Sequence, residues 1–176
     1  MQKKDPISSY KYCPLCAQPL VLSEHDHRQR KVCLSCGFVD YHNPAPAAGA
    51  IIVRDSKLLL VKRAADPYKD CWCIPAGFME WDESPEACTC REIKEETGLE
   101  IVTTKLFRVY SGTDDPRTNA VLILFFCKLI GGEAIAGDDA SEISFYGKAE
   151  IPANIAFVAH RQAIRDLIQE YPNLLK

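Results

Sequence analysis

The sequence predicts an α+β fold, in which a mixed sheet packs between helices and follows a small N-terminal unit held by four cysteines. Strand-length apolar runs alternate with stretches in which apolar residues recur at helical spacing, a pattern that favours an α+β domain. Ahead of them lies a short segment with two Cys-x-x-Cys pairs. The 176 residues suffice for one domain of roughly 130 residues and a small module. We therefore divide the chain into residues 1–40 and residues 41–176.

The N-terminal unit is defined by Cys13-Pro-Leu-Cys16 and Cys33-Leu-Ser-Cys36, with sixteen residues between the two pairs. This spacing is typical of a four-cysteine Zn²⁺ site. About forty residues bury too little surface to fold alone, so a structural metal would supply the missing stability. Two disulfides are the alternative, which we disfavour because nothing in the sequence indicates an oxidising compartment. Because four cysteines complete a tetrahedron, we expect local or solvent contacts for His25, His27 and His42.

The second unit begins after a proline-bearing linker at residues 41–46. Two apolar runs separated by Asp55 and Ser56 indicate a β-hairpin, and a short strand follows at 72–75. Apolar residues at helical spacing between 156 and 168 predict a C-terminal helix. The predicted strands of the hairpin and of the later sheet are 47–54, 57–63, 101–110, 120–128 and 143–146.

Residues 85–97 carry the end signals of a helix. Ser84 suits the N-cap, and Pro85 suits the first turn, where its missing N–H costs nothing. Gly98 is a stop signal, so a helix of about thirteen residues is expected. The apolar stripe that would pack this helix onto the sheet consists of Ala87, Cys90, Ile93 and Thr97.

Three carboxylates share one face of this predicted helix. Glu92, Glu95 and Glu96 stand at positions i, i+3 and i+4, where like charges repel one another. Hard oxygen ligands gathered in this way favour Mg²⁺ or Mn²⁺. A solvated acidic face is the alternative, and the longer pattern around the helix argues against it.

That pattern runs from Gly77 to Leu99 and reads GFMEWDESPEACTCREIKEETGL. It consists of Gly, five residues, Glu, seven residues, and then Arg-Glu-Ile-x-Glu-Glu-x-Gly-Leu. The segment resembles the signature of the Nudix hydrolases at every fixed position. Such a match would arise by chance on the order of once in 10^8 to 10^9 starting points. The resemblance implies a Nudix α/β/α sandwich and an enzyme that hydrolyses acid anhydrides of phosphorus, a pyrophosphatase.

The resemblance also implies roles for individual residues. Glu92 and Glu96 would be the principal ligands of the catalytic Mg²⁺ or Mn²⁺, with Glu95 assisting and the Ala76 carbonyl as a further ligand. One of the glutamates would be the general base. Structural support of the loop and helix would come from Gly77, Glu83, Arg91 and Gly98, with Glu83 and Arg91 paired.

Two candidates lie outside the signature. Nudix enzymes usually draw a further carboxylate from a late loop, and Glu142 matches that place best. Arg63 could contact substrate phosphates, because arginine binds them in a bidentate manner, or it could be a solvated cation. The rivals of Glu142 for the further carboxylate are Glu133, Asp138 and Asp139.

The order of ribbon, Asn-Pro linker, hairpin and signature is similar to that of NADH pyrophosphatases and plant FAD pyrophosphatase-like Nudix proteins. NADH pyrophosphatases carry a Ser-Gln-Pro-Trp-Pro-Phe-Pro array after the signature, whereas residues 109–116 read VYSGTDDP. Because the array is absent, we favour FAD, ADP-ribose or a similar compound over NADH, within the expected class of dinucleotide or ADP-ribose-type substrates. The alternative is a non-catalytic module that binds nucleotide, RNA or protein. The complete carboxylate set argues against that alternative.

Composition limits the partners and the compartment. The formal net charge of −3 argues weakly against nucleic acid as the main partner. No apolar run approaches the eighteen or more residues of a membrane span, and no secretory signal is evident at the start. Nine cysteines without a disulfide pattern indicate a reducing cytoplasm. We expect a small-molecule nucleotide partner and leave a homodimer open as the assembly. Small buried hydrophobic roles are predicted for Cys71, Cys73, Cys88, Cys90 and Cys127.

Overall fold

The computed structural model describes residues 10–137 and 139–176. The chain divides into two compact units, with the boundary between Asn43 and Pro44. The first unit holds a three-stranded antiparallel sheet in the order β1-β2-β3. Its strands are β1 (Val21–His25), β2 (Arg28–Val32) and β3 (Val39–Asp40). Asp26 and His27 form the β1–β2 turn with φ values of 52° and 60°, as a tight two-residue hairpin turn requires.

The second unit is built on one mixed sheet. The main path runs β10-β5-β4-β9-β8, while β6 pairs with β5 and β7 with β4. The β4–β9 pair is parallel, and the other pairs are antiparallel. The strands are β4 (Ala45–Arg54), β5 (Lys57–Arg63), β6 (Trp72–Cys73), β7 (Ala76–Phe78), β8 (Leu99–Gly112), β9 (Ala120–Gly132) and β10 (Ala140–Tyr146).

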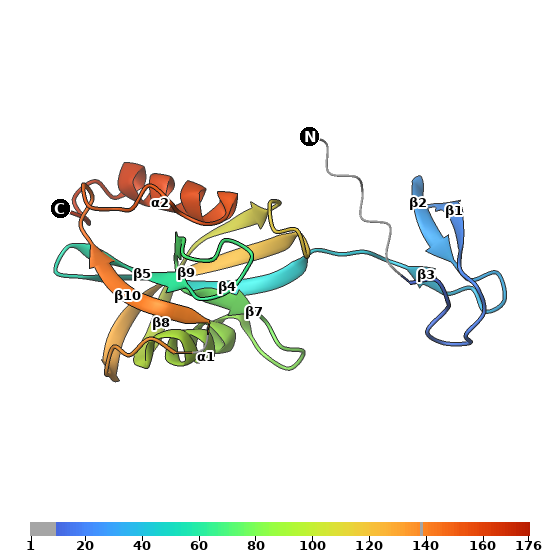
Figure 1. Cartoon of the computed structure of the whole chain (residues 1–176), viewed down its shortest axis with the longest axis horizontal. Coiled ribbons are helices and arrows are strands. Elements are labelled where there is room, and N and C mark those ends of the chain that lie inside the picture. The colour runs from blue at the N-terminus through green and yellow to red at the C-terminus, as the bar shows by residue number, and fades with distance from the viewer. Residues whose placement is uncertain (1–9, 138) are drawn as a thin grey trace. The chain divides into compact units, whose positions relative to one another are not determined.

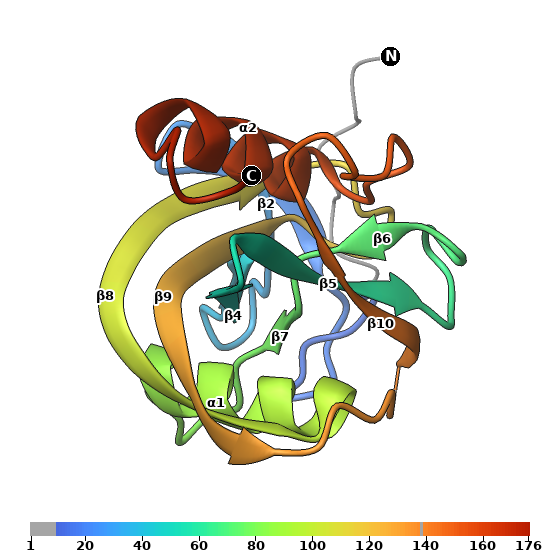
Figure 2. The same cartoon turned by 90° about the vertical axis from the view of Figure 1, so that its left-hand side faces the viewer.

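Two helices cover opposite faces of this sheet, as Figures 1 and 2 show. They are α1 (Pro85–Thr97) and α2 (Val158–Glu170). Strand β4 alternates between the two cores, because successive side chains point to opposite faces. Ile51 packs in the cluster with α2, whereas Ala50 and Ile52 pack in the cluster with Ile93 of α1. The predicted α/β/α sandwich with a mixed sheet is confirmed.

The hairpin turn at Asp55 and Ser56 forms as predicted, with φ values of 53° and 60°. The two strands pair only at their ends, Val53 with Leu58 and Arg54 with Lys57. Further along, β4 pairs with β9 and β7 instead. The predicted linker was too long, because its last two residues belong to β4. Pro46 lies near the start of that strand, where a missing N–H is tolerated.

Two further predictions concern membrane-spanning segments and the burial of the cysteines outside the N-terminal unit. No helix within residues 10–137 and 139–176 has the length and apolarity that crossing a membrane requires. The prediction of small buried cysteines holds for three of them, Cys73, Cys88 and Cys127, whereas Cys71 and Cys90 are half-buried.

Candidate active site

Helix α1 ends where its capping residues predict. The Ser84 hydroxyl accepts the Ala87 backbone N–H at 3.1 Å, and Pro85 is the first helical residue. At the other end Gly98 has a φ of 69° and donates its N–H to the Lys94 carbonyl. These caps fix the position of the acidic residues relative to strand β7, which immediately precedes the loop into α1.

The buried face of α1 differs from the predicted stripe. Ala87 is exposed, so the prediction was wrong at that position, whereas Cys90 is half-buried and packs against the cluster that holds Ile93. A carboxylate, Glu96, lies on the buried side instead. Helix α1 packs mainly against three strands, β4, β8 and β7, so its buried side depends on tertiary packing as well as on the apolar positions. The buried residues of α1 are Cys88, Thr89, Ile93, Glu96 and Thr97.

Glu96 is the unusual group of this site. It is 7% exposed, and its Oε2 has no hydrogen-bond partner among the described residues. Burial, followed by the negative charge of Glu92, raises the pKa of the Glu96 carboxyl to about 8, although the Ala76 N–H donates to it. A buried carboxylate oxygen without a donor is costly unless a cation or proton joins it. The buried Glu96 carboxylate, with the charge of Glu92 beside it, therefore suits a cation. Among the described residues only the four N-terminal cysteines form a group whose ligand atoms lie close together, and the three glutamates of α1 do not form such a group.

Arg91 organises the exposed side of the same helix. Its Nε and Nη2 donate to Glu83 at 2.5 and 2.9 Å, so the expected Glu83–Arg91 pair is present. The pair lowers the pKa of Glu83 to about 2. Arg91 Nη1 also contacts Glu92 at 2.7 Å and Glu95 at 2.9 Å. The i,i+4 spacing on the helix accounts for the pair with Glu95, whereas the contact with Glu83 depends on the loop that carries it.

Gly77 allows β7 to approach α1 closely. A Cβ built at Gly77 would lie 2.0 to 2.2 Å from the carboxylate atoms of Glu92, a distance that real atoms do not reach. Gly49 on the neighbouring strand has a similar role, since its Cβ would lie 2.4 Å from the Cβ of Ala76. Close backbone contact thus brings Ala76 and Gly77 beside the two buried or half-buried glutamates.

Among the candidates for the further carboxylate, Asp139 is the one whose charge affects a glutamate of α1. Its negative charge acts on Glu96, and its backbone carbonyl accepts the Ala64 N–H at 2.7 Å. Glu142 lies opposite Lys62 in the β10–β5 register and forms an ion pair with it at 3.5 Å. Glu133 is exposed, and Asp138 lies outside the described residues.

Arg63, at the end of β5, is held beside the carboxylates. Its Nε donates to the Pro67 carbonyl at 2.8 Å, and its guanidinium lies 5.1 Å from the centre of the Phe157 ring. Its positive charge acts on Glu96. A cation fixed in this way fits the expectation of a phosphate contact better than that of a freely solvated side chain.

Helix α2 carries a buried histidine on which the charge of Arg63 acts. His160 is 8% exposed, and its ring lies 5.5 Å from that of Phe157. Burial, followed by the positive charge of Arg63, lowers the pKa of His160 to about 4. The other charged groups that act on it are Asp114 and Arg161. His160 is therefore neutral at physiological pH.

This burial predicts an acid-sensitive stability. Between pH 4 and the ordinary pKa of 6.5, the unfolded chain binds more protons at His160 than the native protein does. Stability therefore rises with pH across this window and is lost on acidification, by about 2 kcal/mol from pH 7 to pH 5. Urea unfolding at both pH values should show a smaller loss for His160→Gln than for the unsubstituted protein. Equal losses would contradict this assignment.

The four N-terminal cysteines come together in the first unit. Their sulfur atoms all lie within 4.8 Å of one another, and none forms a disulfide. The two turns repeat the same geometry: Ala17 N–H bonds the Cys13 carbonyl and Gly37 N–H the Cys33 carbonyl, each at 2.9 Å. Of the three histidines nearby, His25 Nε2 contacts the Tyr41 hydroxyl at 3.2 Å, a local contact of the expected kind.

Comparisons with known proteins agree with both units. The family model described as NUDIX domain matches residues 43–167, and the model described as Nudix N-terminal, a zinc ribbon, matches residues 11–42. A crystal structure of a NUDIX hydrolase from Nitrosomonas europaea is 31% identical, has a TM-score of 0.82 and covers 93% of each chain.

Two relatives carry names that specify an activity. The chain is 44% identical over 130 residues to an ADP-ribose pyrophosphatase from Methanocaldococcus jannaschii, a match that covers 73% of this chain and 76% of that protein. It is 26% identical over 163 residues to an NAD-capped RNA hydrolase, NudC, from Pseudomonas aeruginosa. That match covers 92% of this chain and 55% of the relative, so the chain spans about half of that protein's length. The chain belongs to the Nudix hydrolase family and carries the family's N-terminal zinc ribbon.

Proposed function

We propose that the chain is a Mg²⁺- or Mn²⁺-dependent pyrophosphohydrolase that acts on a dinucleotide or ADP-ribose-type substrate. The observation that carries the proposal is the buried Glu96 carboxylate, whose Oε2 has no partner among the described residues and whose neighbour is Glu92. The name of the archaeal relative, at 44% identity, supports ADP-ribose as the first candidate. FAD and NADH are the other candidates.

The ligands of the divalent ion would be the carboxylates of Glu92, Glu95 and Glu96 and the carbonyl of Ala76. Bound there, such an ion neutralises diphosphate charge and lowers the pKa of a coordinated water. The chain's own residues position these groups: the Ala76 N–H orients Glu96, and Arg91 orients Glu92. One of these glutamates accepts the proton of the attacking water.

Other residues support the diphosphate and the loop. Arg63 would contact a phosphate oxygen, since the Pro67 and Ala65 carbonyls hold its Nε and Nη2 while its positive charge acts on Glu96. Gly77 would allow β7 to approach α1 closely, and Gly98 would end the helix. The Glu83–Arg91 pair would hold the loop between β7 and α1.

A substrate panel tests the proposal. ADP-ribose, FAD, NADH, dinucleoside polyphosphates and nucleoside triphosphates would each be incubated with Mg²⁺ or Mn²⁺, and release of AMP or phosphate would be measured. We expect hydrolysis of at least one of the dinucleotide or ADP-ribose-type compounds. Binding of these compounds without hydrolysis under any metal condition would favour the non-catalytic module.

The further carboxylate is proposed to be Asp139, because its charge acts on Glu96 while Glu142 is paired with Lys62. We expect Asp139→Asn to lower kcat by about 10²-fold, the range of a lost acid–base group, and Glu142→Gln to lower it less than about threefold. Steady-state kinetics with the preferred substrate would measure both. The reverse order would assign the role to Glu142.

The four cysteines are proposed to hold one structural Zn²⁺, in the ribbon that we place at residues 1–40. Four thiolates within 4.8 Å leave no open position for chemistry, which makes the role structural. The free state of all nine cysteines fits a reducing compartment, and we propose the cytoplasm.

A further inference from the structure

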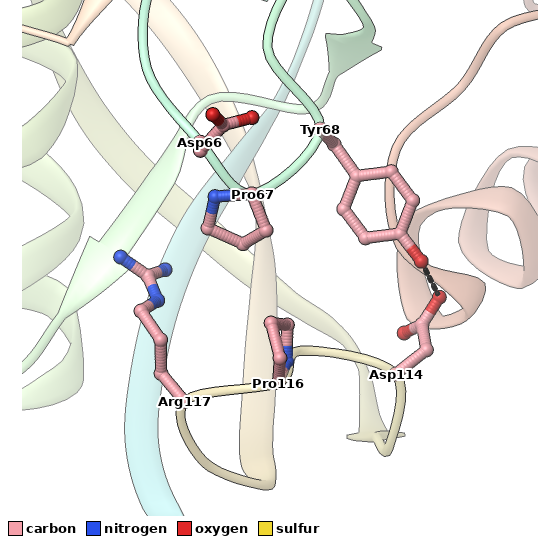
Figure 3. Close-up of a pocket in the computed structure, with 6 residues that line it drawn as sticks. All are labelled: Asp66, Pro67, Tyr68, Asp114, Pro116 and Arg117. Carbon is pink, nitrogen blue, oxygen red and sulfur yellow. Dashed lines mark hydrogen bonds between the residues drawn. The ribbon is translucent and has the colours of Figure 1, made fainter.

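A concavity lined by residues outside the carboxylate helix has no role in the proposed chemistry so far. It has a volume of about 640 Å³, within the range of small-molecule sites. Two loops that are distant in sequence form it, one between β5 and β6 and the other between β8 and β9 (Figure 3). The lining residues are Asp66, Pro67, Tyr68, Asp114, Pro116 and Arg117.

Arg63 links this pocket to the reacting end of the site. The Nε of Arg63 donates to the carbonyl of Pro67, one of the lining residues, at 2.8 Å. The charge of Arg63 acts on Glu96 on one side and on Asp115, in the second loop, on the other. A substrate whose diphosphate lies at Arg63 would thus have one of its ends near the pocket.

The pocket walls are held in place before any ligand arrives. The Tyr68 hydroxyl donates to Asp114 at 2.9 Å, the contact drawn in Figure 3. The same carboxylate accepts the Val158 N–H at 2.9 Å and an Arg161 N–H at 3.1 Å. The half-buried Asp114 thereby ties both loops to the start of α2. Such preorganisation lowers the entropic cost of binding.

The planar guanidinium of Arg117 is held in a fixed orientation by Asp115. Its Nε and Nη2 bind the two oxygens of Asp115 at 3.1 and 2.8 Å, and its backbone N–H binds the same carboxylate at 2.8 Å. Asp115 is 7% exposed and holds the Arg117 side chain in place, whereas the Arg117 side chain itself is half exposed. A guanidinium whose charge is already matched is better suited to stacking on a flat ring than to holding a phosphate.

The remaining lining points to the same class of ligand. Pro67 and Pro116 contribute flat apolar surfaces, and in Figure 3 they lie between Arg117 on one side and Tyr68 on the other. The other lining side chains are two acids, Asp66 and Asp114, so apart from Arg117 the lining offers no cation to a phosphate. An uncharged aromatic ring fits this lining, and a nucleobase is the part of a nucleotide with that chemistry.

We propose that the nucleobase of the substrate binds in this pocket, stacked against the Arg117 guanidinium and the two prolines. The inference rests on the proposed function, since it places the base of the same nucleotide whose diphosphate is cleaved at Glu92 and Glu96. It makes Arg117 a specificity-determining residue that takes no part in proton transfer.

Binding of adenosine to the full, zinc-loaded chain without added Mg²⁺ or Mn²⁺ tests the pocket without catalysis. By isothermal titration calorimetry we expect adenosine to bind and ribose not to bind. Arg117→Ala should weaken adenosine about tenfold, and Arg117→Lys, which keeps the charge but loses the plane, at least about fivefold. Arg165→Ala removes an exposed arginine of α2 and should change nothing. Absence of adenosine binding, or equal affinity in Arg117→Lys and the unsubstituted protein, would overturn the proposal.

Hydrolysis separates the two proposals. With ADP-ribose, Arg117→Lys should act mainly through a raised KM. If the unsubstituted protein hydrolyses ADP-ribose and the KM of Arg117→Lys is unchanged, the pocket assignment fails while the proposed function stands. If no substrate is hydrolysed but adenosine binding depends on Arg117, the proposed function fails while the pocket assignment stands. Thermal unfolding of each folded variant guards against loss of the fold, which Arg117→Lys is chosen to avoid.

Discussion

We expect Glu96→Gln to lose hydrolysis by about 10³-fold or more, which corresponds to about 4 kcal/mol of transition-state stabilisation. The fold should persist, because the Glu96 carboxyl already has a raised pKa from burial and a neutral amide of the same shape removes a buried charge. Steady-state kinetics with Mg²⁺ or Mn²⁺ and circular dichroism measure the two effects. Glu92→Gln should behave similarly.

The matched control is Glu86→Gln, which removes an exposed carboxylate from the first turn of the same helix. It should keep turnover within about twofold, since surface substitutions rarely change stability by more than about 0.5 kcal/mol. Near-normal turnover in a folded Glu96→Gln protein would contradict the assignment of this carboxylate to the metal.

The second large effect is expected in the ribbon. Cys13→Ser/Cys16→Ser should lose the bound zinc and unfold residues up to about 42, because the three short strands bury too little surface without the metal. Elemental analysis should find about one zinc per unsubstituted chain and close to none in the double variant. Hydrogen exchange should locate the unfolding in the ribbon and leave α1 protected.

Cys71→Ser, at a half-buried cysteine outside the cluster, should retain the zinc. Some hydrolysis should persist in the double variant, because the ribbon and the carboxylate helix belong to separate compact units. Unsubstituted protein without zinc, or with Cys13, Cys16, Cys33 and Cys36 paired as disulfides, would contradict the structural zinc site. Complete loss of hydrolysis with a protected α1 would make the ribbon part of the active assembly.

Local signals in the sequence predict those features that depend on neighbours along the chain. The limits of α1 follow from Ser84, Pro85 and Gly98, because capping is decided within one turn of a helix. The β4–β5 turn follows from Asp55 and Ser56 in the same way. Cysteine spacing predicts the gathering of four thiolates for a similar reason, since each pair occupies a single turn.

Features that depend on tertiary packing could not be predicted. The predicted stripe was wrong at Ala87 because the buried side of α1 depends on its contacts with β4, β8 and β7, not on hydrophobicity alone. The burial of Glu96 is the consequence that matters for function. Of the Arg91 contacts, the i,i+4 pair with Glu95 follows from helical spacing, whereas the pair with Glu83 needs the fold of the loop.

The candidate base pocket has no sequence signal of its own. Its two loops are more than forty residues apart, and the contact of Tyr68 with Asp114 joins them only in the folded chain. A comparison of residues 109–116 with the array of NADH pyrophosphatases shows only that the array is absent from this sequence. The structure supplies what is present, a pair of prolines and an arginine plane.

The account rests on a divalent cation at the carboxylate face of α1, and a thermal shift measures this directly. Mn²⁺ should raise the melting temperature of the zinc-loaded protein, because it binds the native state preferentially. In Glu92→Gln/Glu96→Gln the rise should largely vanish, while in Glu86→Gln it should remain. An equal rise in the double variant and the unsubstituted protein would place the cation elsewhere and contradict the proposed active site.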